Sequence, residues 1–356
     1  MWSCFRIHKE SGEKKRHLLE NGGLLLEELI TSFNGRSNPF RSFSKQELKR
    51  ATNNYNQDGI MDEDRFYKWY KGTSEDRAIL VKKFISFASQ EYIGQCIKDV
   101  VVASKMSNHN NVLKLLGCCL ETEVPTLVYE FAGSGSLHQK IYEEELGPSK
   151  KNPQILSWES RLRIATEIAD AVAYLHLGTS QPIIHRDIQS HNILLEEHYV
   201  AKLTDFGHSI SIPLGKTHVV ADLSSFYIEF LAPESKPIWR FTEKSDVYSF
   251  GVLFSEILTG KRVVDILKEV YGVRVCDQLE NSCQLPNSEV LLAEDNEEDI
   301  RVYLKANILT GNTEQLMACA QLAIRCVKWN PDERPSMMEA AKELRRIRRF
   351  QNIQYD

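Results

Sequence analysis

The stretches IIHRDIQSHNILL (183–195) and LTDFG (203–207) decide the fold of this chain. Apolar runs on both sides of a polar loop predict a strand, a loop and a second strand. That arrangement would place Asp187 beside Asn192 and Asp205. Asp187 would then accept a proton from a hydroxyl group, while Asn192 and Asp205 would hold Mg²⁺ against phosphates. The spacing therefore indicates phosphoryl-transfer machinery rather than three unrelated polar loop residues.

Composition excludes several classes of protein. The chain has 356 residues, of which 42% are hydrophobic and 26% charged, as in an ordinary globular protein. Its 44 basic and 49 acidic residues give a net charge of −5, which argues against nucleic acid as a partner. It has no apolar run of the roughly 18 residues that a transmembrane helix needs, and no secretion signal. We therefore expect no transmembrane segment.

None of the eight cysteines belongs to a CxxC pair, so the sequence predicts neither a zinc site nor a disulfide framework. Free thiols fit the reducing cytoplasm, where we expect the protein. Cys4, near Trp2 and Phe5, is most simply an incidental residue of a loose terminus. The alternative is an acylated anchor that would hold the protein peripherally at the plasma membrane.

Strand-like segments come before helical ones along the chain. Short apolar runs between polar turns predict strands at 79–84, 112–120 and 126–131. Ser44 and Glu47 have the spacing of a capping box, and Ser157 is placed as another N-cap. Apolar spacing predicts helices, of which the first is short, at 22–33, 44–55, 90–106, 158–176, 247–258, 314–327 and 337–350. The segment AGSGS (132–136) is the expected hinge between the strand-rich part and the helix-rich part.

Further motifs are LAPE (231–234), KSDVYSFG (244–251) and PDERPSM (331–337). With the two stretches above, they make the chain resemble eukaryotic protein kinases over about residues 45–350. The resemblance implies an α+β, two-lobed kinase-like fold, with a small antiparallel sheet plus one helix in the N-lobe and a large, mostly helical C-lobe. It also implies an ion pair between Glu234 and Arg334, and Asp246 as a brace for the catalytic loop. The expected parts are an N-terminal extension (1–45), the N-lobe (46–131), the C-lobe (132–350) and a tail (351–356).

The segments NGGLLLEEL (21–29), FSKQELKRATNNYN (43–56), LLGCCLETEVPTLVYEF (115–131) and FTEKSDVYSFGV (241–252) resemble plant receptor-like kinases of the wall-associated type. YKWYKG (67–72) resembles one subgroup, the receptor-like cytoplasmic pseudokinases that act as adaptors for a coiled-coil, leucine-rich-repeat immune receptor of the NLR class. That likeness implies two protein partners. They are the leucine-rich-repeat region of the NLR receptor, bound to the large lobe, and a related cytoplasmic kinase modified by a pathogen effector.

The glycine-rich loop of active kinases is missing. Aligning WYKG with the VYKG of active relatives puts Asp62, Asp64 and Tyr67 on the three glycines of GxGxxG. Glycine is needed there because the backbone must approach the phosphates closely. Two carboxylates would instead face a polyanion and repel it. This loop is therefore not built to cover phosphates.

Other cofactor-binding positions are partly kept. Lys82 matches the strand lysine that pairs with the phosphates of ATP, and Asp99 matches its helix glutamate. Aspartate is shorter by about 1.5 Å, so we expect a strained or water-bridged pair. Leu80 replaces a small alanine that lies against adenine, which predicts a tighter pocket.

Two further departures concern catalysis. Gln189 replaces the lysine that neutralises the transferred phosphoryl group, and such a loss costs on the order of 3 kcal/mol, or roughly a hundredfold in rate. The segment 208–231 lacks the GTxGY element that shapes the peptide pocket. Its aromatic residues Phe226, Tyr227 and Phe230 either pack on the large lobe or present a docking surface.

Two functions remain. The first is a pseudokinase that serves as an adaptor in plant innate immunity, for which no cofactor is required; weak binding of ATP and Mg²⁺ stays open because Lys82 and Asp205 are kept. The second is a weakly active or atypical serine/threonine kinase with Asp187 as its base. We favour the adaptor, because phosphoryl transfer depends on positioning and electrostatics, and the positioning loop is lost.

Overall fold

The computed structural model describes residues 2–33, 38–63, 66–85, 90–142, 156–221, 230–235, 239–262, 265 and 313–349. The chain divides into two units. The first comprises residues 1–135, 194–198 and 202–209, and the second comprises 136–193, 199–201 and 210–356. The division between Gly135 and Ser136 falls inside the AGSGS segment. Features predicted at Asp64, Phe226, Tyr227 and the tail 351–356 lie outside the described residues.

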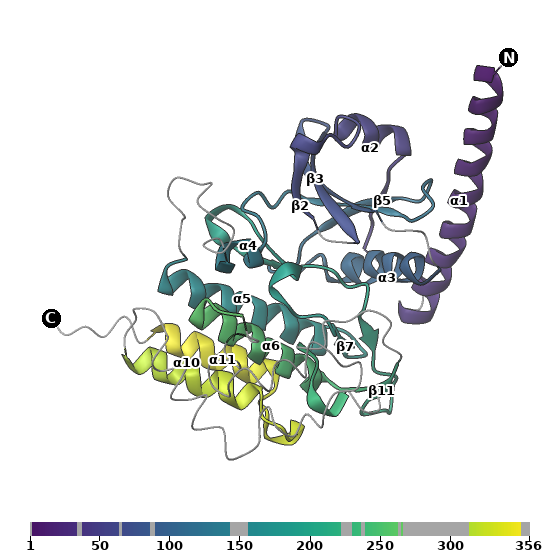
Figure 1. Ribbon diagram of the computed structural model, residues 1–356. Coiled ribbons are helices and arrows are strands. Elements are labelled where there is room, and N and C mark those ends of the chain that lie inside the picture. The colour runs from purple at the N-terminus through teal and green to yellow at the C-terminus, as the bar shows by residue number, and fades with distance from the viewer. Residues whose placement is uncertain are drawn as a thin grey trace. The chain divides into compact units, whose positions relative to one another are not determined.

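A six-stranded sheet forms the centre of the first unit, with the strand order β1-β5-β6-β4-β3-β2 (Figure 1). The strands are β1 (Arg41–Ser42), β2 (Ile60–Glu63), β3 (Tyr67–Ser74), β4 (Arg77–Phe84), β5 (Leu115–Cys119) and β6 (Thr126–Glu130). Neighbouring strands are antiparallel, except that β1 is parallel to β5. Gly117 permits this close parallel contact, because a Cβ atom there would lie 2.0 Å from the carbonyl oxygen of Arg41.

Successive side chains of the strands point to opposite faces of this sheet. On one face, Ile79 and Val81 pack with Leu48 of the short helix α2 (Lys45–Ala51). Helix α2 begins with the predicted capping box between Ser44 and Glu47. On the other face, β4 carries Leu80, which is 1% exposed, and Lys82, which pairs with Asp99 of helix α3 (Gln90–Met106).

Helix α1 runs without interruption from Trp2 to Phe33, although the sequence predicts only a short helix at 22–33. It packs against α3 (Figure 1). The amide of the buried Asn21 donates to the carbonyl oxygens of Leu120 (3.1 Å) and Thr122 (2.9 Å) in the turn between β5 and β6. These tertiary contacts offset the low helix propensity of the glycines at 22 and 23.

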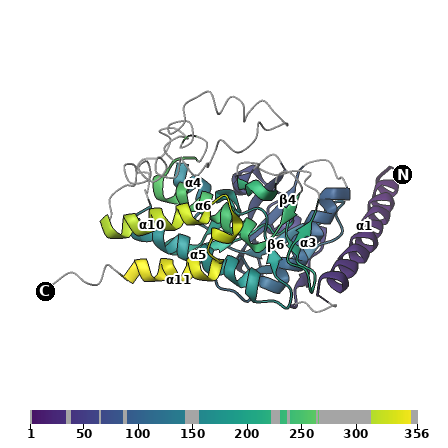
Figure 2. The ribbon, with the colours of Figure 1, turned by 90° about the horizontal axis from the view of Figure 1, so that it is seen from below.

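The second unit is mostly helical. Its described helices are α4 (Leu137–Tyr142), α5 (Trp158–Leu177), α6 (Glu243–Thr259), α10 (Thr313–Cys326) and α11 (Met337–Arg349). Helices α5, α6, α10 and α11 pack side by side (Figures 1 and 2). Ser157 is the N-cap of α5, as predicted, and α6 is buried on nearly every side. A sheet-rich unit followed by a helical unit confirms the α+β class of the expected kinase-like fold.

Short elements connect these helices. The two-stranded pairs are β7 (Ile183–Ile184) with β10 (Ile210–Ser211), β11 (Val219–Val220) with β12 (Arg240–Phe241), and β8 (Ile193–Leu195) with β9 (Ala201–Leu203). The short 3-10 turn η2 (Ser190–Asn192) carries the end of the HRDIQSHN stretch. In the described part of the chain, no helix combines the length and the apolar character needed to cross a membrane.

Candidate functional site

Lys82 of β4 is held between two carboxylates in the first unit. Its Nζ atom lies 2.8 Å from Oδ2 of Asp205 and 3.3 Å from Oδ2 of Asp99. The side chains of Lys82 and Asp99 are 0% and 1% exposed, and that of Asp205 is 15% exposed. Asp99 therefore reaches the lysine directly, and no bridging water is needed to complete the pair.

Lys82, Asp99 and Asp205 lie close together and are largely shielded from water, so the charge of each affects the pKa of the others. Burial alone would lower the pKa of Lys82, but the charges of Asp205 and Asp99 outweigh burial and raise it above its ordinary value. Burial raises the pKa of Asp99, against the opposing charge of Lys82. The backbone N–H of Phe206 donates to Oδ1 of Asp99 at 3.1 Å. Lys82 thus remains an ammonium ion shared by two acids.

Aromatic rings cover the same ammonium group. The Nζ atom of Lys82 lies 4.3 Å from the ring centroid of Tyr67, 5.6 Å from that of Phe84 and 5.7 Å from that of Trp69. Strand register explains this grouping: in the β3–β4 pair, Trp69 stands opposite Lys82 and Tyr67 opposite Phe84. Rings at such distances attract a cation through their quadrupole.

Where the glycine loop would lie, the described residues are the end of β2 at Glu63 and the start of β3 at Tyr67. Asp62 of β2 stands opposite Trp69 of β3. The Asp62 carboxylate accepts a hydrogen bond from the backbone N–H of Glu63 at 2.9 Å, and Glu63 forms an ion pair with Lys68 at 2.5 Å. In a glycine loop, backbone N–H groups at this place would point at phosphates. Here the residues Asp62 and Glu63 bring carboxylates to it.

In the second unit, Asp187 is bound by two neutral amides. Nε2 of Gln189 donates to Oδ1 of Asp187 at 2.8 Å, and Nδ2 of Asn192 donates to Oδ2 at 2.7 Å. Asn192 also donates to the backbone carbonyl of Asp187 at 2.9 Å. The structure thus brings Asp187 and Asn192 together, as the sequence predicts, while Asp205 is part of the first unit. Gln189 stands where a lysine would supply a positive charge.

Asp246 braces this loop from α6. Its buried carboxylate accepts hydrogen bonds from the backbone N–H groups of His185 (2.8 Å) and Arg186 (2.9 Å), and it also contacts Nε2 of His176 at 2.9 Å. Arg186 has a left-handed backbone, with φ of 67°, and such strain persists only where surrounding contacts impose it. Asp246 therefore holds the backbone of this loop, the role that the resemblance to kinases implies for it.

The sequence did not predict the stacked pair of histidines, His138 and His191, that lies next to this loop. The rings of His138, on α4, and His191 lie 3.6 Å apart with an interplanar angle of 21°. Burial, the neighbouring His191 and Arg262 together lower the pKa of His138 to about 3. The sequence gives little signal for this pair, because the two histidines are separated by more than fifty residues and only the contact between α4 and η2 unites them.

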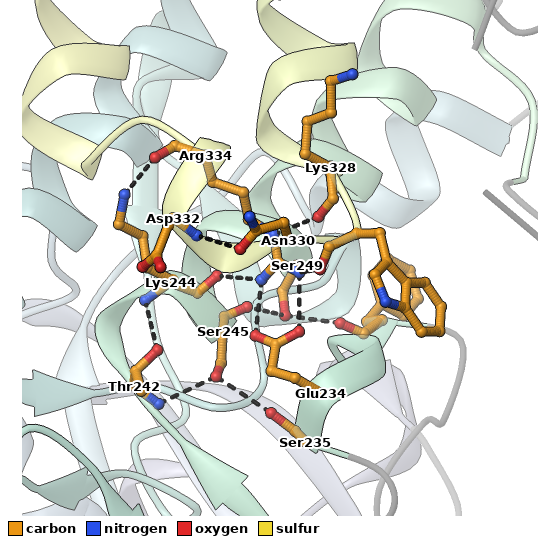
Figure 3. Close-up of polar contacts among 12 residues, drawn as sticks. Glu234, Ser235, Thr242, Lys244, Ser245, Ser249, Lys328, Asn330, Asp332 and Arg334 are labelled. Carbon is orange, nitrogen blue, oxygen red and sulfur yellow. Dashed lines mark hydrogen bonds and ion pairs between the residues drawn. The ribbon is translucent and has the colours of Figure 1, made fainter. Parts of the chain in front are cut away.

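Arg334 and Glu234 form the expected ion pair, shown in Figure 3. The pair is bidentate, with N–O distances of 2.7 and 2.8 Å. The remaining N–H groups of Arg334 donate to the carbonyl oxygens of Lys328 (2.6 Å), Trp329 (3.0 Å) and Lys244 (3.0 Å). The arginine thus uses all five of its donors, which is the full capacity of a guanidinium group.

Of the three aromatic residues in the segment 208–231, only Phe230 is described. It packs partly buried against Ala232, Tyr248 and Val252, and its carbonyl accepts from Ser249 at 2.7 Å. The simpler of the two alternatives, packing on the helical unit, therefore holds for this residue.

Comparison of the sequence with known proteins identifies relatives among the protein kinases. The family model for protein tyrosine and serine/threonine kinases matches residues 59–344. The serine/threonine-protein kinase ZRK1 of Arabidopsis thaliana is 36% identical over 346 residues, covering 95% of this chain and 94% of that protein. The non-functional pseudokinase ZED1 of the same plant is 34% identical over 345 residues, covering 97% of this chain and 100% of that protein.

A third relative, the Arabidopsis wall-associated receptor kinase-like 1, is 35% identical over 348 residues. The match covers 98% of this chain but only 45% of that receptor, so the chain spans less than half of its length. The curated relatives thus include receptor kinases of the wall-associated type, a named kinase and a named pseudokinase. The chain belongs to the protein kinase family.

Proposed function

We propose that this protein is a pseudokinase that works as a protein-interaction adaptor in plant innate immune signalling. The observation that carries the proposal is the 2.8 Å hydrogen bond from the neutral amide of Gln189 to Asp187. A kinase needs a cation at that position to stabilise the charge of the transferred phosphoryl group. A neutral amide supplies no charge, and it occupies an oxygen of the carboxylate that would accept the substrate proton.

The pattern of what is kept and what is replaced supports the same proposal. The groups that hold the fold are intact: Asp246 braces the loop, and Arg334 is bound to Glu234. The groups that would handle phosphate are altered at Gln189 and at the acidic segment around Asp62. Selection for a kinase-shaped binding surface, without phosphoryl transfer, accounts for both.

The proposed partners follow from the resemblance to adaptor pseudokinases. The large, helical unit binds the leucine-rich-repeat region of a coiled-coil NLR receptor. Another face captures a related cytoplasmic kinase after a pathogen effector has modified it. Both partners work in the cytoplasm, at or near the inner face of the plasma membrane. The role needs neither ATP nor Mg²⁺, although Lys82, Asn192 and Asp205 occupy the positions that would hold them.

The alternative function is a weak serine/threonine kinase, and the retention of Lys82, Asp187, Asn192 and Asp205 favours it. A sensitive phosphotransfer assay separates the two. Wild-type protein and Asp187→Asn are compared with Mg²⁺ and with Mn²⁺. We expect both proteins to stay at background. Incorporation that Asp187→Asn abolishes would establish the kinase instead.

The adaptor role needs its own test, because absence of catalysis does not demonstrate binding. Affinity-tagged protein is co-expressed in plant tissue with coiled-coil NLR receptors of the same plant, and co-purification is scored. We expect one receptor to be retained through its leucine-rich repeats. Retention that persists after the repeats are deleted, or binding to no receptor of this class, would refute the assignment of this partner.

A further inference from the structure

The surroundings of Lys82 indicate whether this protein can bind a nucleotide. The inference drawn from them rests on the proposed adaptor function and deepens it. The ammonium group is 0% exposed. It lies between the carboxylates of Asp99 and Asp205 on one side and the ring of Tyr67, 4.3 Å away, on another. In an active kinase this lysine must present its charge to the α and β phosphates of ATP. Here the unit that holds the lysine has surrounded it with its own side chains.

Tyr67 is the residue whose identity makes this possible. It occupies the third glycine position of the GxGxxG pattern, where a residue without a side chain normally lets phosphates approach. Tyr67 begins β3, and its ring packs edge-on against both neighbours of the group, Phe84 (5.9 Å between centroids) and Trp69 (6.1 Å). The tyrosine ring is therefore fixed in place by packing, not merely near the lysine.

The charges of the group disfavour a polyanion as well. Lys82 is matched by two carboxylates at 2.8 and 3.3 Å, so the group offers no excess positive charge. Asp62 lies on the adjoining strand β2, opposite Trp69, and adds a carboxylate at the same end of the sheet, whereas Glu63 is paired with Lys68. A nucleotide would have to displace the ring of Tyr67 from the ammonium group and face the carboxylate of Asp62. The residues present do not fit Mg-ATP.

We propose that Tyr67 is an internal plug that excludes nucleotide: its ring takes the face of the Lys82 ammonium group that a phosphate would use. The protein is therefore a nucleotide-independent scaffold, and the tyrosine determines that property. Tyr67→Gly removes the ring and exposes the ammonium group of Lys82. Tyr67→Phe loses only the hydroxyl, so the ring still covers the lysine.

Two measurements test the plug. In the first, the melting temperatures of wild type, Tyr67→Gly and Tyr67→Phe are compared with and without millimolar Mg-ATP. Tyr55→Ala is the matched control, because Tyr55 covers the neighbouring Lys83 at 4.1 Å. We expect a rise of about 2–4 °C for Tyr67→Gly at roughly ten times its Kd, and no rise for the other three proteins.

The second measurement needs no nucleotide. Native protein is treated with an amine-reactive ester, and labelling of Lys82 and Lys83 is quantified by mass spectrometry. Lys83, which is only partly buried, serves as the internal standard. We expect Lys82 to be protected in wild type and in Tyr67→Phe, and to be labelled at least tenfold faster in folded Tyr67→Gly or, if that variant does not fold, in Tyr67→Ser.

Each outcome has one meaning. A nucleotide-dependent shift in wild type, or wild-type Lys82 that reacts as fast as Lys83, overturns the plug. Folded Tyr67→Gly that binds no nucleotide and keeps Lys82 protected overturns the role given to Tyr67. Wild type that binds Mg-ATP but transfers no phosphate removes the plug and leaves the adaptor function standing. Transfer that depends on Asp187 would remove both.

Discussion

Replacing Arg334 should reveal how much of the stability of the helical unit depends on one fully bonded guanidinium group. The arginine side chain is 0% exposed and donates to five acceptors, two of them on Glu234 and three of them backbone carbonyls (Figure 3). Lysine has three donors, so Arg334→Lys leaves at least two acceptors unbonded. At about 0.5–1.5 kcal/mol for each lost bond, we expect a loss of about 1–3 kcal/mol.

Arg334→Met removes the charge as well, and breaking a buried ion pair costs about 3–5 kcal/mol. Because the Glu234 side chain is 23% exposed, water can solvate part of the remaining charge, and we expect the lower end of that range. Urea denaturation gives the free energy of unfolding. The fluorescence of Trp329, whose carbonyl accepts from Arg334, reports on the same region.

Arg346 is the matched control. It pairs with Glu343 at 2.6 Å on the exposed surface of α11, and its side chain is 57% exposed. Surface pairs contribute only about 0–1 kcal/mol, so Arg346→Met should change the free energy of unfolding little. If Arg334→Met costs no more than Arg346→Met, the bonding of Arg334 does not stabilise the unit and the reasoning fails.

Three other predictions concern pH, the N-terminal helix and the sheet. Because the pKa of His138 is lowered to about 3 in the folded protein, against about 6.5 when unfolded, the unfolded chain binds the extra proton, and stability is lost as pH falls below about 6.5. Urea titrations at about pH 7 and pH 5 should show this loss in wild type and in a control, His198→Gln, whose histidine is exposed, and a smaller loss in His138→Phe; equal losses in all three contradict it. Asn21→Ala removes two hydrogen bonds to the β5–β6 turn, so hydrogen exchange across α1 should become faster while exchange in α5 stays unchanged. Gly117→Ala places a Cβ atom 2.0 Å from the carbonyl oxygen of Arg41, which should separate β1 from β5 and lower the melting temperature by several degrees; a melting temperature equal to that of wild type would show that the strands can move apart without cost.

The sequence by itself determined features whose signal is local. The spacing of Asp187, Asn192 and Asp205 indicated phosphoryl transfer, and together with LAPE, KSDVYSFG and PDERPSM it made the chain resemble protein kinases, because these residues lie in short segments of recognisable pattern. Capping residues and apolar periodicity placed most of the described helices, and the strands β4, β5 and β6, within a few residues, as at Ser44 and Ser157. Such signals depend on neighbours within one or two turns of the chain.

Helix α1 shows where local signals stopped being sufficient. Two adjacent glycines argue against a continuous helix, and propensity alone predicts a short one. Packing on α3 and the hydrogen bonds of Asn21 to a turn about a hundred residues later decide otherwise. The partners of these hydrogen bonds are 99 and 101 residues apart, so local sequence patterns cannot reveal them.

The candidate site depended on tertiary structure in the same way. The sequence identified Tyr67 as a residue out of place in a glycine loop, but only the register of β3 on β4 places its ring over Lys82. Likewise, three of the five acceptors of Arg334, two on Glu234 and one on Lys244, belong to segments 90 to 100 residues away. Strand register and long-range packing fix which side chains meet, and these are properties of the whole fold, because they result from burying one face of each element against another.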